Sequence, residues 1–386
     1  MSNSSAAAPA ELLKFVGCSE FRSRIALSIL TGKPVKISSI RAKLENPGVR
    51  EFEISYLRLI EQITNGTVVR ISETGTVVLF RPGILTGGEF EFDCCAERGI
   101  GYYLEPLMLL GPFGKRSLSV KLTGVSNNSM DPSVEAVSYS CLPLLRRFLG
   151  RDSGSELSLE RRGCHPVGGA EVRFQCPTVS KLKPLDLTQP GKIHRIRGMS
   201  FTCKVSPGMN GRQIVSAKEL LRRLVPDVLL TADHCTGARG GQSPGFGVTL
   251  VAETRDGCRY VAECMSRPSG VAVAEASVPE DVGLTAAQLL CEEIYRGGCV
   301  DSISQPLALA LMALCDRDAS RLLTGPLTPH SVRLLRLLRQ FLGVTFRLQS
   351  RPAGDDGLGG DKVLCTCVGS GFANLSKLAA LEHLDP

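Results

Sequence analysis

His330 is the residue whose type and position in the sequence point most directly to chemistry. It follows the segment 325–329, Gly-Pro-Leu-Thr-Pro, and stands where a run with helical spacing of apolar residues begins. Backbone N–H groups in the first turn of a helix have no partner within the helix, so this end attracts anions. A histidine placed there could attack a phosphorus atom or bind a phosphate. The pattern alone favours a simpler alternative, a solvent-facing residue of the first turn.

Two further segments carry weaker chemical signals. Asp316, Asp318 and Arg321 form the charged cluster that lies close to His330 in the sequence. A ribonuclease needs carboxylates for a metal ion, or an acid–base pair at the scissile phosphate. A solvated acidic turn explains the cluster more simply. The glycine-rich segment 236–247 lacks the Lys-Ser/Thr of a P-loop and precedes a strand, so we expect a flexible hairpin loop there.

The composition argues against global disorder, a membrane span and a zinc finger. The chain has 386 residues, of which 43% are hydrophobic, and its longest apolar run, 307–315, is far shorter than the ~20 residues of a spanning helix. Its N-terminus does not read as a secretory signal, and its 15 cysteines lack the paired spacing of zinc ligands. We expect reduced thiols, no metal site and a cytoplasmic or nuclear location. The net charge of +7 permits a polyanionic partner.

An internal repeat predicts the architecture. The segment 144–150 reads Leu-Leu-Arg-Arg-Phe-Leu-Gly, 337–343 reads Leu-Leu-Arg-Gln-Phe-Leu-Gly, and 59–66 is a weaker copy. Each has apolar residues at helical spacing and ends in a glycine that is suited to stop a helix. Each also follows a proline-containing turn, a short strand and an earlier helix. The sequence therefore predicts an α+β fold of three repeated helix-strand units.

The stretch from about 186 to 287 does not follow this pattern. It begins after a linker-like segment, 184–191, and its periodicity predicts several strands with a helix around 216–224 and another around 286–295. We expect a small α/β insert between the second and third units. The predicted division is 11–185 for units one and two, 186–287 for the insert and 288–378 for unit three.

The order of these segments resembles the RNA 3'-terminal phosphate cyclases over nearly the whole chain. The matching stretches are 22–28, 40–50, 131–147, 243–254 and 324–330. The resemblance implies three repeated α/β units with a small inserted domain. It also implies a reaction in which a histidine is adenylylated, the adenylate passes to an RNA 3'-phosphate, and a 2',3'-cyclic phosphate closes. His330 falls on the position of that nucleophile.

The sequence departs from the cyclase pattern at polar positions that the reaction uses. The family's Glu and Gln before the first helix are missing from 15–19, its Gln after the proline-glycine turn is Phe52, and its Asp-Gln pair is Pro306 and Leu307. Apolar side chains cannot orient Mg²⁺ or triphosphate oxygens. We therefore expect no cofactor and no catalytic residue, with His330 as the alternative.

These departures resemble the cyclase-like branch of the family, in which a tyrosine is more usual at the position of His330. That resemblance implies a nucleolar, catalytically inactive factor of ribosome biogenesis, required for pre-rRNA processing to small-subunit (18S) rRNA. Its implied partners are a ribosome-assembly GTPase and a small nucleolar ribonucleoprotein or pre-rRNA. The candidate phosphate-binding residues are Arg22, Arg41, Arg50, Arg321 and His330. The alternative is an RNA-processing enzyme, either a pre-rRNA endonuclease or a residual cyclase acting through His330.

Overall fold

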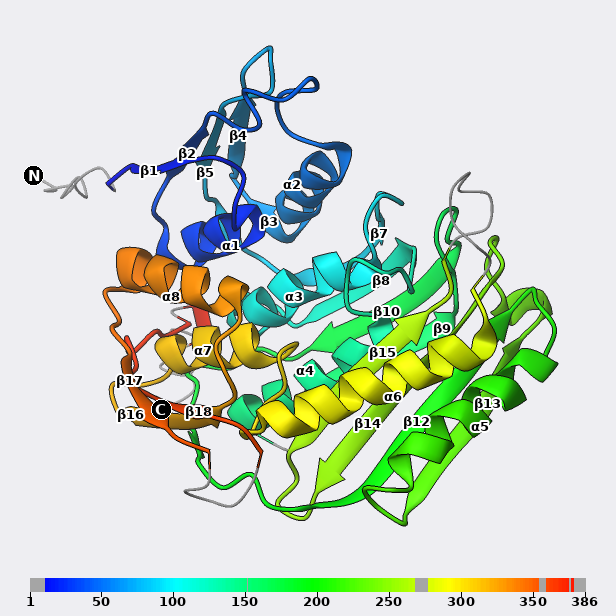
Figure 1. Ribbon diagram of the computed structural model, residues 1–386. Helices are drawn as coiled ribbons and strands as arrows, with labels where there is room; N and C mark the ends of the chain where they lie inside the picture. Colours follow the sequence, from blue (N-terminus) through cyan, green and yellow to red (C-terminus); the bar gives the residue numbers. More distant parts are fainter. Residues whose placement is uncertain (1–10, 151, 268–276, 354–358, 375, 378–386) are drawn as a thin grey trace, which may run out of the picture.

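Three four-stranded sheets repeat one topology in the computed structural model, which describes residues 11–150, 152–267, 277–353, 359–374 and 376–377 (Figure 1). In each sheet the first strand pairs parallel with the second, and the fourth strand lies between the second and the third in antiparallel pairing. The sheet orders are β1-β2-β5-β4, β7-β8-β10-β9 and β11-β16-β18-β17. This shared order confirms the predicted α+β fold and its three units.

The strands and helices of each unit alternate along the chain. Unit one contains β1 (Leu13–Val16), α1 (Phe21–Thr31), β2 (Val35–Ser38), α2 (Glu51–Ile63), β4 (Val68–Ile71) and β5 (Val78–Arg81). Unit two contains β7 (Gly88–Asp93), α3 (Ile100–Leu110), β8 (Leu118–Gly124), α4 (Val134–Leu149), β9 (Glu156–Arg161) and β10 (Ala170–Cys176). Unit three contains β11 (Asp186–Leu187), α7 (Gln305–Leu314), β16 (Ala319–Thr324), α8 (Pro329–Leu342), β17 (Arg347–Arg351) and β18 (Lys362–Val368).

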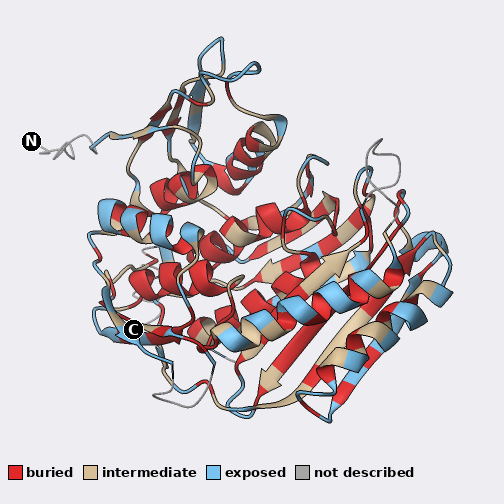
Figure 2. Cartoon of the chain, in the orientation of Figure 1, coloured by how far each residue is buried: buried red, intermediate tan, exposed pale blue. Residues whose placement is uncertain are grey.

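Helices α3 and α7 form the centre of the large body, and α8 covers it. Almost every residue of α3 and α7 is buried, whereas α8 buries one apolar stripe and exposes its other face (Figure 2). The side chain of Thr328 accepts a hydrogen bond from the backbone N–H of Ser331, which fixes the start of α8. Gly343, with φ of 71°, ends the same helix in the left-handed region. This capping holds His330 in the first turn of α8.

The insert is a four-stranded sheet with two helices on one face. Its strands are β12 (Ile193–Cys203), β13 (Val228–Cys235), β14 (Gly245–Thr254) and β15 (Arg259–Met265), in the order β13-β12-β14-β15. Helices α5 (Gly208–Leu221) and α6 (Pro279–Arg296) pack on this sheet and bury a core of their own (Figure 1). The predicted domain border at 287 falls within α6, which continues without a break, so the exact division remains a prediction.

The structure corrects two features of the predicted topology. The stretch predicted as a linker contains β11, which pairs with β16, so the insert enters unit three after its first strand. A two-residue strand is too short to produce a periodic signal, and the opening strands β1 and β7 were missed as well. The glycine-rich segment 236–247 is a crossover and not a hairpin, because β13 and β14 lie on opposite sides of β12. Among the described helices, none has both the length and the apolar character to cross a membrane.

Candidate functional site

His330 lies between two carboxylates at the start of α8. Its Nδ1 is 2.5 Å from Oε2 of Glu20, which precedes α1, and its Nε2 is 3.0 Å from Oε1 of Glu105 in α3. Both ring nitrogens are therefore engaged. The first turn of α8 was expected to hold a histidine facing solvent, but the ring is only 28% exposed.

Two arginines complete this network, which we call the His330 cluster: Glu20, Arg22, Glu105, His330 and Arg333. A nitrogen of Arg22 is 2.9 Å from Oε2 of Glu105, and Nε of Arg333 is 2.6 Å from Oε1 of Glu20. Three cationic groups thus surround two carboxylates, with members from units one, two and three. The cluster joins the three units at a single point.

Neighbouring groups hold the cluster in place. The guanidinium of Arg22 lies 4.1 Å from the centre of the Tyr102 ring and donates a hydrogen bond to the carbonyl of the same residue. The guanidinium of Arg98 lies 4.4 Å from the centre of the same ring and is paired with the buried Asp131. Glu20 has a φ of 55°, a conformation that is uncommon outside glycine. This backbone conformation places the Glu20 carboxylate against α8.

The electrostatic surroundings favour a charged imidazolium. Burial alone would lower the pKa of His330, but hydrogen bonds to Glu105 and Glu20 and their negative charges raise it to about 9. Burial would raise the pKa of Glu105, and the charge of Arg22 with the His330 hydrogen bond instead lowers it to about 2. The pKa of Glu20 is lowered for similar reasons, against burial, by His330 and Arg333. At neutral pH the cluster is therefore fully ionised.

An ionised cluster limits what His330 can do chemically. A histidine acts as a nucleophile through the lone pair of an unprotonated ring nitrogen. In an imidazolium both nitrogens carry protons, and here each proton points to a carboxylate oxygen. Attack on a phosphorus atom would require loss of a proton and the release of one carboxylate. The observed geometry suits a structural cation or an anion-binding group better than a nucleophile.

The other predicted phosphate-binding residues lie in different surroundings. Arg41 makes two hydrogen bonds, of 2.7 and 2.9 Å, with the buried carboxylate of Glu53. Arg50 precedes α2, and its guanidinium has no ion pair within the part of the chain that the structure describes. Arg321 is exposed, is paired with Asp186, and lies on β16 before the segment that leads to His330. The structure thus brings Arg22 to His330 and leaves Arg321 apart.

The acidic residues that the sequence placed near His330 are not its partners. Asp316 pairs with Lys181 at 3.0 Å, on the far side of β16 from the start of α8. The carboxylates that do reach His330, Glu20 and Glu105, were missed because they lie far away in the sequence. One signal for Glu105 was available, since it is the single charged residue of the apolar helix α3.

The residues around His330 do not fit the metal-assisted adenylylation of the cyclase reaction. Phe52 packs edge-on against Tyr102 with 5.5 Å between ring centres, and Pro306 and Leu307 line an apolar pocket beside Arg22. Both carboxylates of the cluster are already neutralised by cations. Within the described residues, no group of three or more His, Cys, Asp or Glu side chains is arranged to hold a metal ion.

Comparison with known proteins identifies the family. The sequence pattern that describes the RNA 3'-terminal phosphate cyclases matches residues 13–348. The chain belongs to the RNA 3'-terminal phosphate cyclase family. It is 50% identical over 372 residues to the human "RNA 3'-terminal phosphate cyclase-like protein", covering 96% of this chain and 99% of that one.

More distant members of the cyclase family match over the same length. A "Probable RNA 3'-terminal phosphate cyclase-like protein" of Drosophila melanogaster is 44% identical, covering 95% of this chain and 97% of the fly protein. The "rRNA processing protein rcl1" of Schizosaccharomyces pombe is 36% identical, covering 95% of this chain and 98% of the yeast protein. The likeness thus spans all three units and the insert.

The raised pKa of His330 predicts a pH-dependent contribution to stability. Because the folded protein binds this proton more tightly than the unfolded chain, the contribution is complete below about pH 6.5 and is lost as the pH rises through about 9. The His330→Gln variant should therefore be destabilised by about 2 kcal/mol at pH 6, after allowing for the partial exposure of the ring. The destabilisation should largely vanish at pH 10. Chemical denaturation at both pH values measures this difference.

A variant without the two carboxylates separates the effect of the His330 charge on stability from the effect of its packing. In a Glu20→Gln/Glu105→Gln protein, the His330→Gln change should show little dependence on pH, because the carboxylates that bind the proton are gone. A destabilisation of equal size at pH 6 and pH 10 in the unaltered background would contradict the charged state described above.

Proposed function

We propose that this chain is a catalytically silent, cyclase-like factor of pre-rRNA processing. It keeps the fold of the RNA 3'-terminal phosphate cyclases and uses it to bind partners. Support for the role comes from the yeast relative that is named as an rRNA processing protein and is similar over nearly its full length. Support for the loss of catalysis comes from the His330 cluster.

The proposal extends to location and partners. We place the protein in the nucleolus, in the processing of pre-rRNA to small-subunit (18S) rRNA. Its proposed partners there are a ribosome-assembly GTPase and a small nucleolar ribonucleoprotein or the pre-rRNA itself. A net charge of +7 is compatible with RNA as one of these partners.

The observation that carries the proposal is the engagement of both His330 nitrogens by carboxylates. Adenylylation needs a free, unprotonated nitrogen and supporting groups that orient the triphosphate. Here the nitrogens are 2.5 and 3.0 Å from Glu20 and Glu105, and the neighbouring positions Phe52, Pro306 and Leu307 are apolar. The histidine is retained, but its surroundings serve the packing of three units.

Incubation of the full chain with α-labelled ATP and Mg²⁺ should leave no covalent label on the protein. The reason is that the imidazolium offers no lone pair to the α-phosphorus. The assay is a denaturing gel, with His330→Ala as the matched variant and an active member of the family as the positive control. A labelled band that disappears in His330→Ala would show that His330 is adenylylated and would support the alternative of a residual cyclase.

The endonuclease alternative requires a separate assay. Incubation with a pre-rRNA fragment that spans a processing site should leave the RNA intact when the protein acts alone. Cleavage that persists in His330→Ala and is lost in an Asp316→Asn/Asp318→Asn variant would overturn the silent-factor proposal and favour the nuclease.

RNA binding is expected to use the arginines of unit one. Arg50 is the most available of them, because Arg22 and Arg41 already contact Glu105 and Glu53. The Arg50→Ala variant should bind a pre-rRNA fragment about three- to ten-fold more weakly at low salt, and its slope of log affinity against log salt should fall by about one. Filter binding or fluorescence anisotropy measures both quantities.

The control for this variant is Arg212→Ala. Arg212 is an exposed arginine of α5 in the insert and is paired with Glu280. It should leave the affinity and the salt slope unchanged. Equal losses in the two variants would show that general charge, and not the predicted site, determines binding.

A further inference from the structure

Cys164 and Cys203 meet at the junction of the insert with unit two. Cys164 follows β9 in unit two, and Cys203 ends β12 of the insert. Both side chains belong to a small buried cluster with Phe201 and Cys235. All cysteines of the chain are free thiols. Two reduced cysteines from separate parts of the fold thus pack in one buried cluster.

The backbone around this pair is built for close approach. Cys203 faces Gly245 in the register of β12 with β14. A Cβ atom on Gly245 would lie 2.8 Å from the sulfur of Cys164, closer than real contacts allow. The absence of a side chain at Gly245 therefore lets Cys164 reach the strand that carries Cys203.

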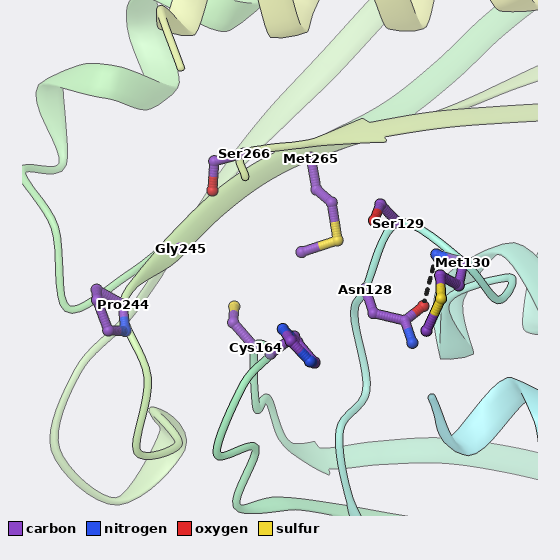
Figure 3. Close-up of a pocket in the computed structure, with 9 residues that line it drawn as sticks. Asn128, Ser129, Met130, Cys164, Pro244, Gly245, Met265 and Ser266 are labelled. Atoms are coloured by element: carbon purple, nitrogen blue, oxygen red, sulfur yellow. Dashed lines mark hydrogen bonds between the residues drawn. The ribbon is translucent and has the colours of Figure 1, made fainter. Parts of the chain in front are cut away.

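A small cavity leads to the pair. Its volume is about 150 Å³, and its lining includes Asn128, His165, Met265 and Cys164. Figure 3 shows Cys164 rising from its loop toward the space between Met265 and Asn128. A water molecule occupies roughly 30 Å³, so a molecule the size of hydrogen peroxide fits.

The charges around the pair favour a thiolate. The hydrogen bond from the Cys164 thiol lowers the pKa of Cys203 against the opposing effect of burial. The backbone N–H of Gly241 and the charges of Arg162 and Lys204 lower it further. Arg162 is itself buried and lies 4.1 Å from the ring centre of Phe201. Because the two thiols share a hydrogen bond, the first proton is lost from the pair as a unit.

We propose that Cys164 and Cys203 are a redox-active dithiol, which a small peroxide converts to a disulfide that ties the insert to unit two. The Cys164 thiol passes its proton to the Cys203 thiolate, and the Cys164 sulfur, which lines the cavity, forms a bond to one peroxide oxygen. The O–O bond breaks, and the departing hydroxide takes up the first proton to become water. Cys203 then attacks the sulfur of the resulting sulfenic acid. The S–S bond forms, the S–O bond breaks, and a second water leaves with the second thiol proton.

Peptide mapping of the full chain tests this site. The native protein is treated with a small excess of hydrogen peroxide, quenched, alkylated with iodoacetamide and digested without reductant. Mass spectrometry should find a peptide pair linked through Cys164 and Cys203, lighter by two hydrogen atoms than the sum of the reduced peptides. The pair should separate again after treatment with dithiothreitol.

Two variants of the same buried cluster make the result specific. Cys203→Ser should abolish the linked pair and leave Cys164 as a sulfenic acid that dimedone traps, whereas Cys235→Ser should leave the linked pair intact. Thermal unfolding checks that each variant is folded. Full alkylation of Cys164 and Cys203 after peroxide treatment would overturn the proposal, as would a link from either one to Cys235.

Discussion

A carboxylate within an apolar helix is the constraint on which the large body depends. Glu105 lies in α3, whose other residues are almost all buried and apolar. The Glu105 side chain itself is 37% exposed, and a partly buried charge is stabilised when it is paired and hydrogen-bonded. Arg22 from unit one and His330 from unit three supply those partners. The packing of the three units therefore brings the partners of this charge together.

The same ion pairs keep His330 from acting as the nucleophile that its position in the family suggests. Glu20 binds the second ring nitrogen and is itself held by Arg333. The ring then serves as a cation between two anions. Pro306 and Leu307, which line the pocket beside Arg22 and Glu105, and Phe52, which packs on Tyr102, offer no group that could orient a nucleotide. A family fold with a retained nucleophile position can thus support a structural role, which is the basis of the proposed function in pre-rRNA processing.

Much of the fold followed from the sequence, and little of the cluster did. Apolar periodicity and the repeated Leu-Leu-Arg-x-Phe-Leu-Gly segments predicted the helices and the three units, because such signals are local. The two-residue β11 produced no pattern, so the predicted insert began one strand too early, at β11 instead of after it. Glu105 and His330 are 225 residues apart, and only the packing of units brings them together. The single charged residue of α3, Glu105, indicated that a cationic partner was needed, but the sequence did not identify Arg22 and His330 as its partners.

NMR titration of the His330 ring would determine its charge state, on which its role between the two carboxylates depends. Two-dimensional ¹H–¹⁵N spectra report whether each ring nitrogen carries a proton, and His330→Gln identifies the signals. Both nitrogens should stay protonated at neutral pH, and the ring should titrate with a midpoint near 9. A midpoint near the ordinary value of about 6.5 would contradict this charge state, because a neutral ring at pH 7.5 would leave His330 free to act as a nucleophile.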